Sequence, residues 1–301
     1  MRHVLGIDAG GTKTVGLLAD ETGRVLAEAR AGGANLQTHG ELEVEKVFHD
    51  IIERLSPQER IDALGLGIAG VDRPRDEAVV RGILRRLGHR ESVRVVNDAM
   101  IALVAGAPER FGIVILAGTG SIAYGVDREG RSARAGGYGS LLADEGSGYW
   151  LGHEALRAVV RASDGRGPET QIVELVLRSL AIDSVAELVP LVYEKAMPQH
   201  QIAALASLVL KASANGDAVA TRILSDAAAE LALAARSVAR QLGFGKDAFP
   251  LVLAGGVLKA SPTLPSLIEA RLEMPGARLL RLEGEPAKGA VTLALDLLRP
   301  A

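Results

Sequence analysis

One stretch of this sequence occurs twice in similar form, as Gly6–Gly33 and again as Gly112–Gly137. Each copy has a short apolar strand, a turn of glycine with threonine or serine, a second strand, an Asp-x-x-Gly-Arg turn and a closing Ala-Arg-Ala-Gly-Gly. Glycine-rich hairpins can resemble each other by chance, but a shared order of features is more than turn chemistry requires. The repeat therefore predicts a duplicated β-hairpin unit that opens each of two lobes.

The rest of the chain alternates between helical and strand patterns. This alternation is typical of α/β sheets covered by helices, and 301 residues are enough for two domains with separate cores. Because each lobe opens with a glycine turn at a strand end, we expect a ligand in the cleft between the lobes. Helices are expected over 42–55, 76–87, 98–105, 149–161, 170–180, 201–214, 218–242, 265–272 and 287–298, and strands over 63–68, 93–96, 250–253 and 277–280.

Composition excludes several classes of function. The net charge of -3, without any Lys/Arg-rich run, gives no reason to expect nucleic acid. The absence of cysteine excludes disulfides, thiolate zinc sites and iron–sulfur clusters held by this chain, and is compatible with a reducing cytoplasm. Asp8 interrupts the first apolar run, and charged residues interrupt the alanine-rich segment Leu224–Leu242, so neither a signal peptide nor a membrane span is expected.

The two glycine turns have the composition of phosphate-binding loops. A turn that presents backbone N–H groups to a phosphate cannot carry bulky side chains on the approaching face, and hydroxyl and ammonium groups add further donors. Two such turns facing each other would hold one polyphosphate from both sides; the alternative is a plain hairpin in each lobe. The candidate groups are the glycines Gly10, Gly11, Gly118 and Gly120, the hydroxyls of Thr12, Thr14, Thr119 and Ser121, and the ammonium group of Lys13.

Two further features suit a nucleotide. Asp8 ends the first strand, where its carboxylate can hold Mg²⁺ through water, because Mg²⁺ prefers one or two carboxylates together with phosphates. Its other interpretation is an end-of-strand cap. A third glycine turn, at Gly255 and Gly256, follows a buried strand and leads into a helix. It would seat a nucleotide base or ribose, or serve only as a tight strand–helix turn.

Six motifs occur along the chain in a characteristic order. They are GIDAGGTKT (Gly6–Thr14), GIAGVD (Gly67–Asp72), NDA (Asn97–Ala99), LAGTGS (Leu116–Ser121), GGYGSLLADEGSGYWLG (Gly136–Gly152) and LAGGV (Leu253–Val257). With these motifs the chain resembles the N-acetylglucosamine kinase and BadF-type ATPase family, within the actin-like sugar kinase/Hsp70 superfold, and the similarity spans nearly the whole chain. The resemblance implies two ribonuclease H-like lobes, with ATP, Mg²⁺ and a sugar substrate meeting in the cleft.

The resemblance makes Asp98 the general base. Phosphoryl transfer needs in-line positioning, charge neutralisation and a carboxylate that accepts the proton of the attacking hydroxyl. Asp98 lies where a buried strand ends and a helix begins. From the residues alone, a helix N-cap is an equally good interpretation.

The resemblance also assigns the sugar contacts. Asn35 matches a sugar-contacting asparagine, and its alternative interpretation is a turn residue. Asp144 matches a sugar-contacting aspartate, and its alternative interpretation is a helix cap. Gly136, Gly137 and Tyr138 match the neighbouring sugar loop. Asp72 and Glu145 are weaker candidates for sugar contact, and Ser213 aligns loosely with an adenine-side position.

The expected reaction is ATP-dependent phosphorylation of N-acetylglucosamine to its 6-phosphate. Tyr138 stands where the family's N-acetylglucosamine kinases have tryptophan, and the chain is short, so glucosamine kinase or broad-specificity hexokinase is the alternative. The Asp144–Glu145 pair favours an amino sugar. A non-catalytic sugar sensor and a sugar-independent ATPase are alternatives of another class. The absence of cysteine excludes the family's cluster-bearing activators.

The resemblance implies the domain organisation as well. The N-terminal lobe is expected over 1–107, completed by 287–301, and the C-terminal lobe with a helical insertion over 108–286. Glycines near Gly106 and within 284–289 are expected hinges for a cleft that closes on sugar and keeps water from the γ-phosphate. A homodimer is an expectation from the resemblance alone.

Overall fold

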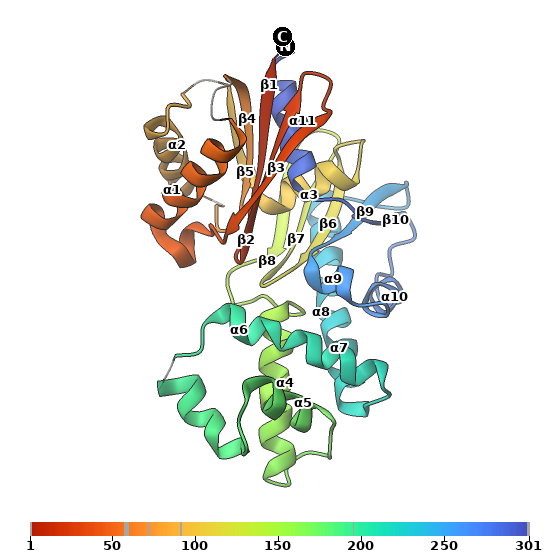
Figure 1. Ribbon diagram of the computed structural model, residues 1–301. Helices are drawn as coiled ribbons and strands as arrows, with labels where there is room; N and C mark the ends of the chain where they lie inside the picture. Colours follow the sequence, from red (N-terminus) through yellow and green to blue (C-terminus); the bar gives the residue numbers. More distant parts are fainter. Residues whose placement is uncertain (1, 57–59, 72, 91, 195, 300–301) are drawn as a thin grey trace.

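The two copies of the repeat open two five-stranded sheets (Figure 1) in the computed structural model, which describes the chain apart from residues 1, 57–59, 72, 91, 195 and 300–301. In each sheet three antiparallel strands are followed by two parallel ones. The predicted class, α/β with two ribonuclease H-like lobes, is therefore confirmed. The first sheet has the order β3 (Val25–Gly32), β2 (Lys13–Asp20), β1 (His3–Ala9), β4 (Ile61–Ile68), β5 (Val93–Asn97), and the second has the order β10 (Ala277–Arg281), β9 (Phe249–Ala254), β6 (Gly112–Ala117), β7 (Ser121–Val126), β8 (Ser132–Gly136).

The turns between the second and third strands of the two sheets have the same hydrogen bonds. Asp20 Oδ1 accepts the backbone N–H groups of Thr22 and Arg24 at 2.9 and 3.1 Å. Asp127 Oδ1 accepts the N–H groups two and four residues further on, at 3.0 and 2.8 Å. In both turns a glycine takes a left-handed φ, of 86° and 81°, which glycine adopts without a Cβ penalty. The duplicated hairpin predicted from the sequence is therefore present in detail.

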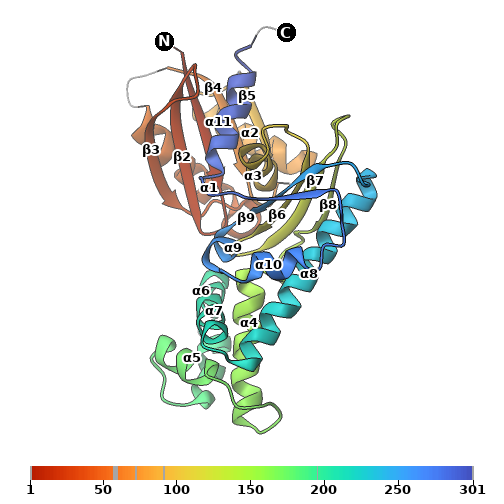
Figure 2. The same cartoon turned by 90° about the vertical axis from the view of Figure 1, so that its right-hand side faces the viewer.

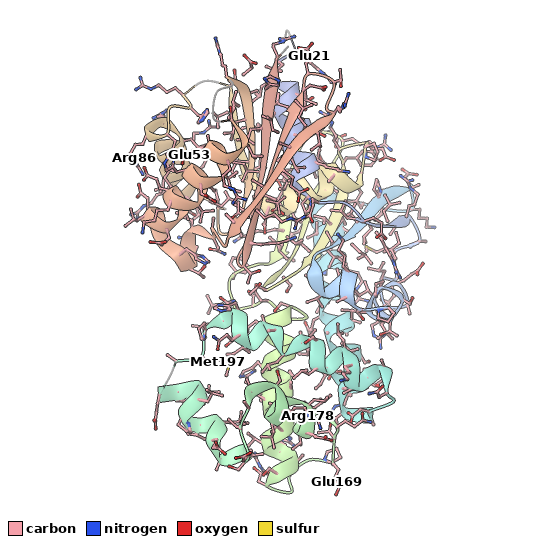
Figure 3. All side chains as sticks on the ribbon, in the orientation of Figure 1. Glu21, Glu53, Arg86, Glu169, Arg178 and Met197 are labelled. Carbon is pink, nitrogen blue, oxygen red and sulfur yellow. The ribbon has the colours of Figure 1, made fainter. Side chains whose placement is uncertain are left out.

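Helices cover the sheets largely where the periodicity predicts them. Figure 3 shows Arg86 on the outer side of the first sheet, where it binds Glu41 and Glu45 at 2.6 and 2.7 Å and so joins the first two helices. The helices are α1 (Leu36–Leu55), α2 (Pro74–Arg86), α3 (Asp98–Gly106), α4 (Gly148–Ser163), α5 (Ile172–Leu180), α6 (Gln199–Ala204), α7 (Ala206–Ala214), α8 (Ala218–Leu242), α9 (Gly256–Ala260), α10 (Leu264–Glu269) and α11 (Ala287–Asp296), with a 3₁₀ turn at Val185–Glu187 and a π-helical turn at Pro190–Glu194.

Two helices differ from their predictions. The helix expected over 201–214 is two helices, α6 and α7, that meet at Leu205. The first helix begins at Leu36 rather than residue 42, because Asn35 caps it, and it bends at Gly40, whose φ is 77°. Sequence periodicity does not show either feature, because both depend on local backbone geometry rather than on the spacing of apolar residues.

The last helix, α11, packs on the inner face of the first sheet. Strand glycines make this close approach possible: a Cβ at Gly6 would lie 2.5 Å from the Val291 backbone nitrogen, and one at Gly65 would lie 2.0 Å from the Ala290 carbonyl oxygen. Real Cβ contacts are never so short. Any side chain at these two positions would push the helix off the sheet.

Helix α3 lies between the two sheets (Figure 2). On one side Ile101 is buried with Ala290 of α11, and on the other Leu103 is buried with Val114 and Val252 of the second sheet. A Cβ at Gly106 would lie 2.5 Å from a methyl group of Val252. This helix therefore fixes the distance between the lobes at its own position.

The helices α4 to α7 and one end of α8 form a separate layer below the second sheet (Figures 1 and 2). Their buried faces continue the apolar core of the second sheet through residues such as Leu151, Val209 and Ala220. Among the described residues, no single helix is both long and apolar enough to cross a membrane. Gln199–Ala214 and Ala218–Leu242 meet both conditions only when taken together, and the chain bends by 118° between them.

Candidate active site

The two predicted phosphate turns touch each other across the lobes. The hydroxyl oxygens of Thr12 and Thr119 are 3.4 Å apart, and a Cβ at Gly11 would lie 3.7 Å from that of Thr119. Each turn is closed by a backbone bond, from Gly10 N–H to the Lys13 carbonyl at 3.0 Å and from Gly118 N–H to the Gly120 carbonyl at 2.9 Å. Residues more than a hundred positions apart in the chain therefore meet as the sequence predicts.

The four predicted hydroxyl donors fall into two pairs. Thr14 and Ser121 are buried, and their hydroxyls donate to the carbonyl oxygens of Gly32 and Glu145, both at 2.8 Å. Thr12 is exposed and Thr119 half-buried. In this structure Thr14 and Ser121 hold the turns in shape, while Thr12 and Thr119 present hydroxyls at the place where the turns meet.

The third glycine turn lies directly against the second sheet. Gly255 has a φ of 103°, and a Cβ there would lie 2.2 Å from the Ala117 carbonyl oxygen, so only glycine fits. Ala117 immediately precedes Gly118, which brings the third turn beside the second. Gly256 begins α9 and faces open space. The three predicted glycine turns are therefore neighbours.

Two carboxyl groups lie at the same edge of the first sheet. Asp8 is in β1 and Asp98 follows β5, and both strands flank β4. Burial, and then the negative charge of Asp98, raise the pKa of Asp8 to about 7, although Lys13 acts in the opposite direction. A carboxyl group whose pKa is raised by burial beside a second carboxyl group, at a glycine turn, is typical of functional sites.

The helix-cap interpretation of Asp98 does not fit the structure. The N-cap of α3 is Asn97, whose side-chain oxygen accepts the N–H of Met100 at 2.8 Å. Asp98 is the first residue of the helix and is half-buried, and its Oδ1 accepts the adjacent Ala99 N–H at 3.0 Å. In the NDA motif, therefore, the Asn97 amide caps the helix, and the adjacent Asp98 carboxylate does not serve as the cap.

Asn35 has a structural role at the start of α1, and this role is compatible with sugar contact. Its side-chain oxygen caps α1 by accepting the N–H groups of Gln37 and Thr38 at 2.9 and 3.3 Å. A Cβ at Gly70, in the GIAGVD loop, would lie 2.7 Å from that oxygen. The capping bonds use only the oxygen, so the amide nitrogen is the part of Asn35 that can donate to a ligand. Asp72 lies outside the described residues.

Asp144 is held at the second phosphate turn. It is buried, has a left-handed φ of 69°, and accepts the backbone N–H groups of Ser121 and Gly139. A Cβ at Gly120 would lie 2.7 Å from Asp144 Oδ2. Burial raises the pKa of Asp144 above its usual range. The structure thus places this predicted sugar ligand against Gly120, whereas it places Asn35 against Gly70 on the other lobe.

The loop that follows β8 is open and glycine-rich. Tyr138 is 59% exposed, and the Arg134 guanidinium lies 4.4 Å from the centre of its ring. Gly136 and Gly137 both have left-handed φ values, and the next apolar side chain along the loop, Leu141, is 92% exposed. Sequence reasoning missed Arg134, because nothing in its strand context distinguishes it from an ordinary surface arginine.

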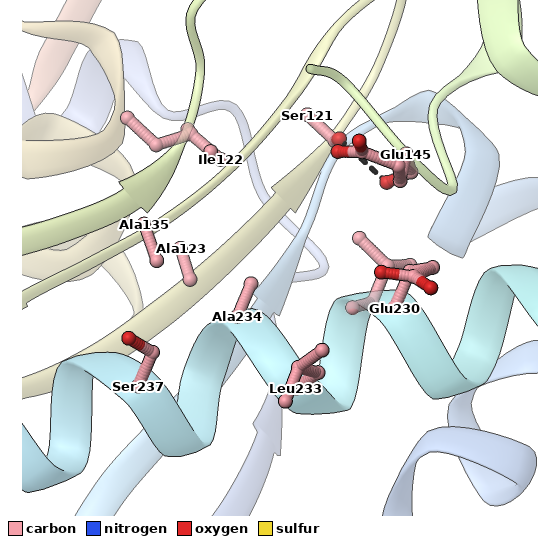
Figure 4. Close-up of a pocket in the computed structure, with 11 residues that line it drawn as sticks. Ser121, Ile122, Ala123, Ala135, Glu145, Glu230, Leu233, Ala234 and Ser237 are labelled. Carbon is pink, nitrogen blue, oxygen red and sulfur yellow. Dashed lines mark hydrogen bonds between the residues drawn. The ribbon is translucent and has the colours of Figure 1, made fainter.

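A cavity of about 390 Å³ lies between the two lobes, and among the described residues none of those predicted for the site lines it. It is lined from the first lobe by Val71 and Asn97, which neighbour Gly70 and Asp98, and from the second lobe by Tyr124 and Arg134. A separate pocket of about 230 Å³ is lined instead by three residues that the sequence singles out, Ser121, Gly136 and Glu145, and by Glu230 of α8 (Figure 4). Ser213, the loosely matched adenine-side residue, lies in the last turn of α7, and its hydroxyl is 3.3 Å from that of Thr221 in α8.

Among the described residues no cluster of three metal-ligating side chains occurs. Mg²⁺ is commonly held by one or two carboxylates together with water and phosphate oxygens, so it does not require such a cluster. The half-buried Asp8 carboxyl, beside the turns that would hold the phosphates, fits such an ion.

Comparison with known proteins gives a consistent result. Residues 5–294 match the BadF/BadG/BcrA/BcrD ATPase family. The chain is 36% identical to the N-acetylmuramic acid/N-acetylglucosamine kinase of Clostridium acetobutylicum, with 98% of each chain covered. It is 34% identical to the N-acetyl-D-glucosamine kinase of Dictyostelium discoideum, with 97% of each covered. A solved structure from Chromobacterium violaceum, named as a candidate N-acetylglucosamine kinase, superposes with a TM-score of 0.80 at 28% identity, covering 98% of this chain and 99% of the other.

Proposed function

Because the chain belongs to the BadF/BadG/BcrA/BcrD ATPase family, we propose that it transfers the γ-phosphoryl group of ATP to the 6-hydroxyl of N-acetylglucosamine. Two relatives that are 34% and 36% identical over nearly their whole length are named as kinases of N-acetylated amino sugars, which supports this substrate class. The observation that carries the proposal is the contact between the phosphate turns, with Thr12 and Thr119 oxygens 3.4 Å apart, beside the Asp8 and Asp98 carboxyl groups.

The glycine turns account for binding of the phosphates. The backbone around Gly10–Thr12 and Gly118–Thr119 can approach phosphate closely, and the hydroxyls of Thr12 and Thr119 and the Lys13 ammonium group add donors. Asp8 would hold Mg²⁺ through water, and Mg²⁺ neutralises the charge that develops on the phosphates. The shape of the third turn, at Gly255 and Gly256, suits a ribose or base at the neighbouring position.

Asp98 is the proposed general base. It accepts the proton of the sugar hydroxyl as that oxygen forms a bond to the γ-phosphorus, while the bond from phosphorus to the bridging oxygen breaks and ADP leaves. Its position at the start of α3 keeps the carboxylate at the sheet edge next to Asp8. Because the α3 N-cap is Asn97, the carboxylate is not needed to begin the helix.

The proposed sugar site lies beside the interlobe cavity. The Asn35 amide group, the Tyr138 loop and Asp144 would contact the sugar after the lobes and the loop move, since Asn35 and Asp144 are held on different lobes here. Closure would also keep water from the γ-phosphate. We place the reaction in the cytoplasm, where ATP is the available phosphoryl donor.

The test is ADP release from Mg·ATP in a coupled assay with N-acetylglucosamine, N-acetylmuramic acid, glucosamine, glucose or no sugar. We expect turnover that requires an N-acetylated amino sugar and falls by about a hundredfold or more in Asp98→Asn, the usual scale of general-base loss. Asp50→Asn, on the exposed face of α1, is the matched control. Turnover with glucosamine or glucose alone would correct the substrate. Turnover that ignores every sugar, or survives Asp98→Asn, would contradict the kinase mechanism.

A further inference from the structure

Glu285 binds two cations of the first lobe at once. Its Oε2 accepts the Lys13 ammonium group at 3.2 Å, and its Oε1 accepts the Arg30 guanidinium at 3.0 Å. Arg30 is in turn bound to Glu28 at 2.7 Å. Lys13 is the cation of the first phosphate turn, and it is 272 positions from Glu285 in the chain.

The segment that carries Glu285 crosses between the lobes. It leaves β10 in the second sheet and enters α11, which packs on the first sheet. Lys259 lies on α9, the helix that follows the third glycine turn. Its ammonium group donates to the carbonyl oxygen of Gly284, the residue before Glu285, at 3.5 Å. The crossing segment therefore contacts two lysines, Lys13 at the first phosphate turn and Lys259 near the third glycine turn.

The charges and their exposure favour a fixed, ionised Glu285. Its side chain is 22% exposed, whereas those of Lys13 and Arg30 are 55% and 52% exposed. Burial acts to raise the pKa of Glu285, but the hydrogen bonds from Arg30 and Lys13 outweigh it, and the pKa lies below its usual range. A free lysine side chain loses rotamer entropy when it becomes ordered. A carboxylate that is already anchored by Arg30 restricts Lys13 before any ligand arrives.

We propose that Glu285 is a positioning residue for the nucleotide, which holds the Lys13 ammonium group at the first phosphate turn and ties that turn to the interlobe crossing. An ammonium group has three donors, so Lys13 can keep its bond to Glu285 and donate to a phosphate oxygen as well. The proposal rests on the proposed function, in that Lys13 is taken to bind nucleotide phosphate.

The experiment measures the Kd of a non-hydrolysable Mg·ATP analogue by calorimetry, without sugar, for wild type, Glu285→Gln, Lys13→Met and the double variant. Glu283→Gln, on an exposed side chain of the same segment, is the control. We expect Glu285→Gln to raise the Kd roughly three- to tenfold, the scale of ordering one long side chain. Lys13→Met should raise it further, and the double variant should match Lys13→Met, because Glu285 acts through Lys13. Thermal unfolding monitored in parallel identifies any variant that has simply lost its fold.

Three results would overturn the proposal. The first is an unchanged Kd in folded Glu285→Gln. The second is a lower Kd in that variant, which would mean that the carboxylate competes with phosphate. The third is an effect of Glu285→Gln on the Kd that is as large in the Lys13→Met background as in the wild type. If the wild-type protein bound no nucleotide, the proposed function itself would fail. Because binding is measured without turnover, these two kinds of failure are distinguishable.

Discussion

The hydroxyl oxygens of Thr12 and Thr119 lie 3.4 Å apart, although one residue belongs to the first hairpin unit and the other to its duplicate. No room for a phosphate group exists between two oxygens at this separation. A polyphosphate must therefore lie across both turns or move them apart. In either case the hydroxyls of Thr12 and Thr119 lie where the two turns meet.

Replacing Thr119 by valine should weaken nucleotide binding with little effect on the fold. Valine keeps the shape and removes one hydrogen bond to a charged phosphate, which is worth about 1.5–3 kcal/mol, so we expect the KM for ATP to rise about tenfold or more. Steady-state kinetics at saturating sugar would measure this. Thr292→Val is the control, because its hydroxyl donates only to the Lys288 carbonyl within α11. Equal KM values for the two variants would contradict the role of Thr119.

Asp8→Asn should stabilise the protein at neutral pH while removing its activity. The folded-state pKa of Asp8 is raised from 3.8 to about 7, so between these values the folded protein binds a proton more tightly than the unfolded chain. Stability is therefore lost as the pH rises through that window, by up to about 4 kcal/mol at its upper end. Asparagine carries no charge and avoids this loss.

The measurement for Asp8→Asn is the unfolding free energy in denaturant, without Mg²⁺, across the acidic to neutral range. We expect the variant and wild type to agree near about pH 4 and to diverge progressively up to about pH 7. A constant difference at every pH would show that the effect is not the titration of Asp8.

Two substitutions of Asn35 should separate capping from sugar binding. Asn35→Asp keeps an oxygen acceptor for the N–H groups of Gln37 and Thr38 and loses only the amide donor, so stability should be nearly unchanged while the KM for sugar rises. Asn35→Ala should lose about 1 kcal/mol of stability as well. Thermal unfolding and sugar-dependent kinetics check both. If Asn35→Asp left the KM for sugar at the wild-type value, Asn35 would be only a helix cap.

Gly289→Ala should damage both stability and catalysis. A Cβ at Gly289 would lie 1.9 Å from the Ile101 carbonyl oxygen, so α11 and α3 must separate, at a cost of about 3 kcal/mol or more. Because α3 begins at Asp98, kcat should fall while the KM for ATP changes less. Gly32→Ala is the control, since a Cβ there meets nothing within 4 Å. Equal unfolding free energies for the two variants would contradict this account of the α3–α11 contact.

Local signals account for much of what the sequence predicted correctly. Helix α8 has the predicted bounds because both of its ends are marked, by the Asp217 side chain that caps its start and by Gly243, whose φ is 71°, at its end. The twin hairpin turns were predictable for the same reason, since each aspartate binds backbone only two and four residues away.

Features that depend on contacts between distant segments could not be predicted in this way. The break between α6 and α7 at Leu205 has no glycine or proline to mark it, and it lies where α4 approaches so closely that a Cβ at Gly152 would be 1.9 Å from the Ile202 carbonyl oxygen. The contacts of Asp144 with Gly120 and of Glu285 with Lys13 likewise join segments that no local pattern relates. The motifs predict which residues form the site, but not which neighbours hold them there.

The packing of α11 against Gly6 and Gly65 has a consequence for the order in which the protein is made. Domains generally fold as units as they leave the ribosome, amino-terminal first. Here the strands β1 to β5 are synthesised before the second sheet, but α11, the helix that covers their inner face, is synthesised after it. The second sheet and its helices are complete before that helix exists. The first sheet is thus translated before the second and completed only after it.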